Sequence, residues 1–130
     1  PFVGLGLIPE LASSYLLPRL LGMQRTKEIC YFSERIPARE LLKLGLINRV
    51  LPHDQLMPFC RDRALKLVAP QGAELAVRAA KRILHKPFID AVAAALDREN
   101  EALNRGVATA DFREAFTARM EKRPPVFRGR

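Results

Sequence analysis

The stretch that decides the fold is PFVGLGLIPELASSYLLPRLLG, residues 1–22, because an apolar entry punctuated by glycine and proline leads directly into a helical pattern. Residues 1–8 carry only apolar side chains and glycines, so we expect their surroundings to be dry. Glu10 is the only carboxylate in residues 1–22. It is either a solvated first-turn residue stabilised by the helix dipole or a group placed for proton transfer.

Local signals predict a mostly helical chain with one short strand. Ser13 and Ser14 are candidate caps or first-turn residues of the first helix. The elements expected in the first part are an extended stretch near 2–6, helices near 11–21 and 24–33 with Gly22 between them, a short helix from Pro37 to Gly45, and a strand at 47–51.

The second part has apolar residues at helical spacing, which predicts four more helices. They are expected from about residue 54, from Pro70 to about 83, from about 88 to 103, and from Thr109 or Asp111 onward. The stripes include Leu56, Phe59, Leu75, Ile83, Phe88, Phe116 and Met120. For any one helix, we expect the apolar stripe to face the core of the monomer. Together, the stripes contain more apolar residues than a small core can bury, which favours assembly into an oligomer.

The composition is that of a globular protein, with 48% hydrophobic and 28% charged residues. No apolar run approaches the ~20 residues that a membrane crossing needs, so no membrane association is expected. Cys30 and Cys60 form no CxxC pair, and His53 and His85 are far apart in sequence. We therefore expect reduced thiols in a cytoplasmic or otherwise intracellular protein, with an organelle left open, and no metal site.

Basic residues dominate the chain, which has a net charge of +8, and they concentrate at its end. The last residues include Arg119, Lys122, Arg123, Arg128 and Arg130 against Glu121. This cluster is either a solvated basic helix end or a contact for an anionic partner. A nucleic acid is not the expected partner, because the aromatic residues lie on the apolar stripes and no recognition motif is present.

Three segments in order carry a family resemblance: residues 1–22, SERIPARELLKLGLINRVLP at 33–52, and EKRPPVFRGR at 121–130. Together they resemble the C-terminal half of the crotonase superfamily, which comprises enoyl-CoA hydratases and isomerases. The resemblance implies a mostly α fragment of an α/β crotonase (ClpP/crotonase-like) fold. Residues 1–52 would be the end of the spiral core with the active-site helix, and residues 53–130 the C-terminal helical trimerisation and CoA-capping region.

The resemblance also implies site residues. Phe2 stands where hydratases of the family carry a catalytic glutamate, and Glu10 stands where they carry a glycine after proline. A glutamate at the later position is similar to the Δ3,Δ2-enoyl-CoA isomerases. Glu10 is then the catalytic proton shuttle, Phe2 and Leu11 are substrate-binding residues of the acyl pocket, and Lys122 matches the tail lysine that reaches CoA.

The expected activity is therefore the shift of a 3-enoyl-CoA double bond to the 2-position, with enoyl-CoA hydration as the alternative. A non-catalytic acyl-CoA-binding or assembly scaffold of the same fold is a further alternative. The resemblance implies a homotrimer or hexamer and no cofactor, because the CoA thioester is itself the substrate. It also implies that the oxyanion-hole donors come from a preceding half, so this chain alone is expected to be an inactive fragment.

Overall fold

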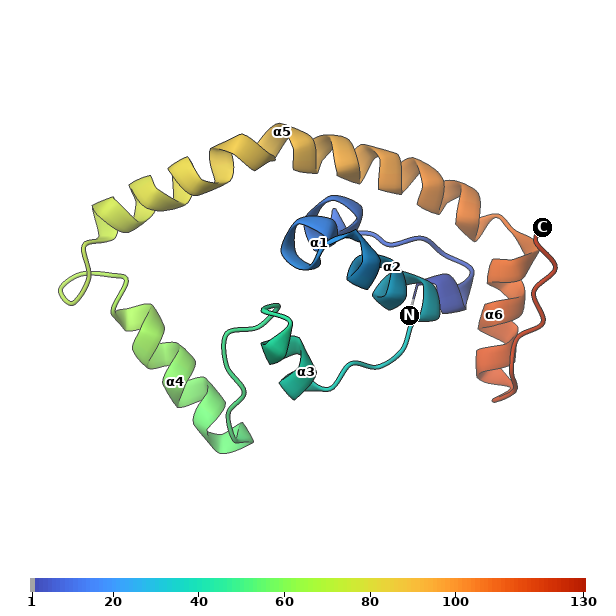
Figure 1. The fold of residues 1–130 in the computed structure, drawn as a ribbon, viewed down its shortest axis with the longest axis horizontal. Helices are drawn as coiled ribbons and strands as arrows, with labels where there is room; N and C mark the ends of the chain where they lie inside the picture. The colour runs from blue at the N-terminus through green and yellow to red at the C-terminus, as the bar shows by residue number, and fades with distance from the viewer. Residues whose placement is uncertain (1) are drawn as a thin grey trace.

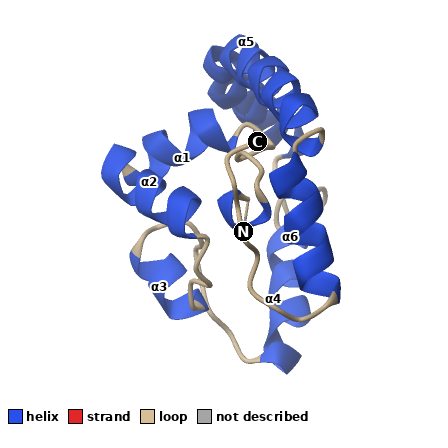
Figure 2. Cartoon of the chain, turned by 90° about the vertical axis from the view of Figure 1, so that its right-hand side faces the viewer, coloured by secondary structure: helices blue, strands red, loops and turns tan. Residues whose placement is uncertain are grey.

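A computed structural model describes residues 2–130, and residue 1 of the predicted 1–52 segment lies outside it. The described backbone forms helices, turns and loops without a strand, as Figure 2 shows. The elements are η1 (Val3–Leu5, a 3-10 helix), α1 (Ser13–Leu21), α2 (Met23–Phe32), α3 (Ala38–Lys43), α4 (His53–Leu65), α5 (Glu74–Val107) and α6 (Ala110–Met120).

Helices α1 and α2 pack against each other and confirm the two helices expected near 11–21 and 24–33. Gly22 separates them with φ 76°, a value that suits glycine. The Thr26 hydroxyl donates to the Gly22 carbonyl at 2.9 Å and so closes the first turn of α2. Thr26 and Cys30 are the buried residues of this helix.

The long helix α5 arches over α1 and α2, with α6 at one end and α4 at the other (Figure 1). Its 34 residues correspond to roughly 50 Å of helix. It packs against α1 and α6, while η1 packs against α2 and α6. The N-terminal segment is therefore held between the last turns of α5, the start of α6 and the α1–α2 pair.

The two helices expected from Pro70 to 83 and from 88 to 103 are one continuous helix, so that division is wrong. Pro70 lies in the turn before α5, and Pro87 lies inside the helix. Proline removes one backbone donor and bends a helix, which is consistent with the arched course of α5 in Figure 1. Proline inside this helix bends it without ending it.

The predicted extended stretch near 2–6 and the predicted strand at 47–51 are also wrong. Residues Val3–Leu5 form a 3-10 turn that Gly6 ends with φ 69°. Residues 47–51 form bends and loop. A strand needs a neighbour to complete its backbone hydrogen bonds, and residues 2–130 offer none. The apolar character of 47–51 was therefore a poor guide to its backbone.

The interior of the described chain is made of small side chains. The buried apolar residues are Ala12, Cys30, Ala95, Ala115 and Ala118. The stripes expected to form a core are exposed instead, with Leu75 at 83%, Ile83 at 71% and Met120 at 71%. The total exposed surface is 10450 Å², whereas a compact monomer of this mass exposes roughly 6,900 Å². The arch leaves apolar faces open that a compact domain would cover.

Candidate functional site

Residues 6–12 run along the last turns of α5 and place Glu10 between two anchor points (Figure 1). At one end Gly106 lies so close to Leu7 that a Cβ atom on the glycine would be 3.4 Å from Leu7 Cδ2. At the other end the backbone N–H of Ala12 donates to Oε2 of Glu99 at 2.7 Å. The position of Glu10 is thus set by two contacts with one helix.

The turn after Glu10 has an unusual backbone. Leu11 and Ala12 both adopt the left-handed conformation, with φ 60° and φ 58°. Each such residue costs about 1–3 kcal/mol when it is not glycine, and such conformations persist only where surrounding contacts enforce them. Ala12 is also the N-cap of α1, and its side chain supplies no capping hydrogen bond. The turn therefore depends on a partner from elsewhere in the chain.

That partner is Glu99 of α5. Its side chain bonds to the start of α1 with both oxygens: Oε2 accepts from the Ala12 N–H at 2.7 Å and Oε1 from the Ser14 N–H at 2.8 Å. Glu99 is only 4% exposed. A carboxylate at a helix N-terminus satisfies free N–H donors and complements the helix dipole.

Sequence reasoning missed Glu99, although a signal was present. Glu99 lies one helical turn from Ala95 and one from Leu103, on the apolar side of α5. A charged residue on an apolar stripe needs a partner when it is buried, because an unpaired buried charge is costly. The sequence pattern alone does not identify the donors that bond to the Glu99 carboxylate.

Glu10 itself is half-buried. Its carbonyl oxygen accepts a hydrogen bond from the Ser13 N–H at 3.1 Å, and the Ser13 hydroxyl also contacts this oxygen. The cap position of α1 is Ala12, so Ser13 and Ser14 are not its caps but its first-turn residues, which is the other role expected of them. The Glu10 backbone is tied down locally, and within residues 2–130 its carboxylate takes part in no ion pair.

The two residues predicted for the acyl pocket differ in exposure. Phe2 is half-buried at the start of η1, and its carbonyl accepts from the N–H groups of Leu5 and Leu7, each at 2.9 Å. Leu11 follows Glu10 and is 77% exposed. Leu11 therefore presents an exposed apolar side chain at the position that follows Glu10.

Lys122 lies in a tight turn at the C-terminal end of α6. Its φ is 56°, in the left-handed region usually occupied by glycine at this helix position. The Lys122 N–H donates to Arg119 O at 3.3 Å, and the Arg123 N–H donates to Ala118 O at 2.9 Å. Lys122 is exposed, and no hydrogen bond or ion pair within residues 2–130 joins it to Glu10.

The tail beyond Lys122 folds back along α6, and two acidic residues hold it there. Asp111 accepts from the backbone N–H groups of Arg128 at 2.7 Å and Gly129 at 2.8 Å. Glu114 accepts two hydrogen bonds from the Arg123 guanidinium, at 2.5 and 3.0 Å. Sequence reasoning missed both acidic residues, and it treated Arg123 as part of an open basic cluster although carboxylates pair with it.

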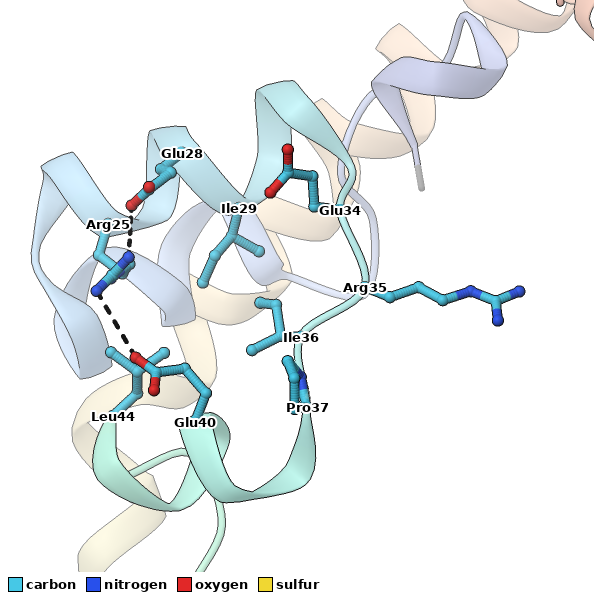
Figure 3. Close-up of a pocket in the computed structure, with 9 residues that line it drawn as sticks. All are labelled: Arg25, Glu28, Ile29, Glu34, Arg35, Ile36, Pro37, Glu40 and Leu44. Atoms are coloured by element: carbon cyan, nitrogen blue, oxygen red, sulfur yellow. Dashed lines mark hydrogen bonds and ion pairs between the residues drawn. The ribbon is translucent and has the colours of Figure 1, made fainter.

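A pocket lies away from Glu10, between α2, residues 34–37 and α3 (Figure 3). Its volume is about 190 Å³, below the roughly 300–1,000 Å³ of small-molecule sites. Arg25 at its rim pairs with Glu28 at 2.6 Å and reaches Glu40 at 4.0 Å, while Arg35 points away from the cavity. This pocket is too small for a CoA thioester.

Other features of the described chain bear on its chemistry. Cys30 is buried and Cys60 is exposed, and both are free thiols. Burial raises the pKa of the Cys30 thiol above its ordinary value. In residues 2–130 no cluster of three or more histidine, cysteine or acidic side chains is arranged to hold a metal ion. No helix in this range is both long enough and apolar enough to cross a bilayer.

The chain matches the enoyl-CoA hydratase/isomerase family over residues 1–130. It is 35% identical to an enoyl-CoA isomerase/hydratase of Mycosarcoma maydis, covering 100% of this chain and 47% of that protein. It is 34% identical to a short-chain-enoyl-CoA hydratase of Clostridium acetobutylicum, covering 95% of this chain and 46% of that protein. The chain thus spans about half the length of these curated relatives.

Solved structures agree with the sequence comparison. An enoyl-CoA hydratase/isomerase from Pseudoalteromonas atlantica superposes with a TM-score of 0.86 at 34% identity, over 98% of this chain and 51% of that one. An enoyl-CoA hydratase from Mycobacterium avium subsp. paratuberculosis gives a TM-score of 0.88 at 28% identity, with the same two coverages. The fold is the mostly helical part of a crotonase-type fold. The chain belongs to the enoyl-CoA hydratase/isomerase family of the crotonase superfamily.

Proposed function

We propose that the intact protein isomerises a 3-enoyl-CoA to the 2-enoyl-CoA, with Glu10 as the single acid/base. The observation that carries this proposal is the half-buried residue Glu10, whose carboxylate is free of ion pairs in the described chain, in a segment anchored to α5 on both sides. A group that transfers a proton twice must hold its place while the substrate rearranges.

The proposed chemistry needs one base. Glu10 removes a proton from C2 of the 3-enoyl thioester, and the electron pair of that C–H bond moves toward the thioester oxygen to give a dienolate. The protonated Glu10 returns the same proton to C4, which leaves the double bond between C2 and C3. Donors to the dienolate oxygen stabilise the intermediate, each by about 2.7–4 kcal/mol. In the family these donors belong to the preceding half, so the fragment alone is proposed to be inactive.

The surroundings of Glu10 support an acyl substrate. Leu11 places an exposed apolar side chain next to Glu10, and Phe2 is the aromatic side chain at the other end of the same N-terminal segment. With Phe2 in place of a second carboxylate, the segment has no second acid/base of its own. That favours proton transfer by one group over the activation of water, which takes two.

We assign the CoA moiety to Lys122. The turn after α6 fixes the backbone of this exposed residue, and its neighbour Arg123 is held by Glu114 and Glu121. Lys122 is therefore the cation of the EKR sequence that remains available to a phosphate. A flexible ammonium group acts as a point charge toward phosphates.

Enoyl-CoA hydration is the second candidate. The Clostridium acetobutylicum relative is named a hydratase, and the Mycosarcoma maydis relative carries both activities in its name. Hydration would need a second acid/base besides Glu10, and residues 2–12 contain no other carboxylate. The two reactions differ in substrate, so one assay separates them.

Assembly into a trimer or hexamer is part of the proposal. The exposed surface exceeds that of a compact monomer by roughly 3,500 Å², on the scale of the 2,000–5,000 Å² of obligate interfaces. Exposed apolar residues on α4, α5 and α6 supply much of the open face. The rest of the protein and neighbouring subunits would cover it, and light scattering of the intact protein measures the assembly directly.

The test of the proposed function is a paired assay of the intact protein and its Glu10→Gln variant, with 3-enoyl-CoA isomerisation and 2-enoyl-CoA hydration measured side by side. Isomerisation is expected in the parent and falls about 10²-fold or more in the variant. Glu101→Gln is the matched control, because Glu101 is an exposed residue on α5. Hydration without isomerisation would replace the proposal by the second candidate, and CoA binding without either reaction by a scaffold.

A further inference from the structure

We infer that Glu99 is the positioning residue of the reacting carboxylate: it holds the Glu10–Ala12 turn from α5 and so places Glu10 against the substrate. The inference rests on the proposed function, because it gives Glu99 a role only through Glu10. Glu99 itself lies behind the turn, bonded to backbone N–H groups and 4% exposed.

The geometry makes Glu99 the long-range restraint at this turn. The hydrogen bonds from the Ser13 N–H to Glu10 and from the Tyr15 N–H to Ala12 are local, so they would move with the turn as a unit. The two bonds to Glu99 cross 87 and 85 residues of sequence and tie the turn to a different helix. They also satisfy the backbone N–H groups of Ala12, which belongs to the strained Leu11–Ala12 pair, and of Ser14, which lies two residues after it.

The two acceptor oxygens explain why a carboxylate is needed. One oxygen faces the Ala12 N–H and the other faces the Ser14 N–H. A glutamine has the same shape but replaces one acceptor by an NH₂ group, which would face another donor. Glu99→Gln therefore keeps the volume of the side chain but loses one of the two hydrogen bonds to the backbone N–H groups of Ala12 and Ser14, so the turn is free to tilt.

The experiment uses the intact protein and measures kcat and KM for isomerisation per folded active site, well below the melting temperature. For Glu99→Gln we expect kcat to fall roughly 10- to 100-fold with KM changed by no more than about twofold. The control is again Glu101→Gln, the same substitution at an exposed position of the same helix. Its kcat stays at the parent value.

A double-mutant cycle separates positioning from a merely structural role. When Glu10→Gln has already removed the proton shuttle, adding Glu99→Gln is expected to lower the residual rate by less than about twofold. If Glu99→Gln does not fold, Glu99→Asp takes its place in the cycle, because it keeps both acceptors on a shorter arm. A kcat per folded site equal to that of the parent overturns the inference, and so do fully additive losses in the cycle.

The same cycle distinguishes the two possible failures. If Glu10→Gln leaves isomerisation unchanged, the proposed function fails, and the positioning role fails with it. If Glu10→Gln abolishes isomerisation while the Glu99 variant retains full kcat, only the role of Glu99 fails.

Discussion

The Glu114 carboxylate and the Arg123 guanidinium form a two-fold hydrogen-bonded pair, with distances of 2.5 and 3.0 Å. The same carboxylate accepts from the Val126 N–H at 2.9 Å, so Glu114 binds both a side chain and the backbone of the tail. Hydrogen bonding from Arg123 and then from Val126 lowers the pKa of Glu114 from 4.5 to about 2. This carboxylate is therefore the pH-sensitive attachment point of the tail.

The first prediction concerns the stability of the protein at acidic pH. Because the pKa of Glu114 is lowered in the folded state, its contribution to stability is fully present above about pH 4.5 and is lost as the pH falls toward about 2. The melting temperature of the intact protein should exceed that of Glu114→Gln near neutral pH, and the difference should shrink as the pH falls from about 4.5 toward about 2. Glu101→Gln, which removes an exposed i,i+4 pair, should show almost no difference throughout. A gap that stays constant with pH would contradict the assignment.

The second prediction separates the two roles of Lys122. Its left-handed backbone strains any residue with a Cβ atom, so Lys122→Gly should be about 1 kcal/mol more stable than Lys122→Ala in urea unfolding. Both variants lose the ammonium group, and calorimetry should show CoA affinity reduced to the same extent, roughly 2- to 5-fold. Lys122→Arg keeps a positive charge as the control. If the CoA affinity of the variants follows their stability and not their charge, Lys122 has a role in folding alone.

The third prediction concerns Gly6, where backbone freedom and close packing coincide. Its φ is 69°, and a Cβ atom would lie 3.3 Å from the backbone of Asp111 and Phe112. Gly45 has φ 75° and nothing within 4 Å, so Gly45→Ala measures the left-handed strain alone. We expect a loss of about 1–2 kcal/mol for Gly45→Ala and a further loss of about 1 kcal/mol or more for Gly6→Ala. If Gly6→Ala and Gly45→Ala lower the free energy of unfolding equally, the backbone of α6 shifts to accommodate the added Cβ atom at residue 6.

The fourth prediction tests the start of α6. The Thr109 hydroxyl accepts from the Phe112 N–H at 3.1 Å and donates to Gly106 O at 2.7 Å, so it joins the end of α5 to the start of α6. Thr109→Ala should lower the free energy of unfolding by about 1 kcal/mol. Thr109→Ser keeps the hydroxyl and should recover most of that loss. If the serine variant is as unstable as the alanine variant, the methyl group matters more than the cap.

The helices with clear local end signals were predicted well. Gly22 separates α1 from α2, Pro37 precedes α3, and Thr109 caps α6, as their residue types indicated. These signals work because a cap or a turn involves only residues a few positions apart. The resemblance read from three short segments is confirmed by the family match over the whole chain.

The wrong predictions depended on neighbours that a local pattern does not contain. Residues 47–51 had strand-like composition but no strand to pair with in the described chain. The stripe residues Leu75 and Ile83 had core-like spacing, yet the arch leaves them open. The separate helices expected from Pro70 to about 83 and from about 88 to 103 are one helix, α5, which continues through Pro87. In each case the outcome was decided by what lies beside the segment.

The sequence by itself therefore determined the helical content, the main helix ends, the family and the candidacy of Glu10, because these depend on residue type and short spacing. Only the tertiary structure brought Glu99 to the first turn of α1 and Glu114 to Arg123. Each of these contacts depends on the path of the chain between its partners, and in the first case that path covers more than 80 residues. A buried acidic residue can be recognised in sequence as needing a partner, but the partner is chosen by the fold.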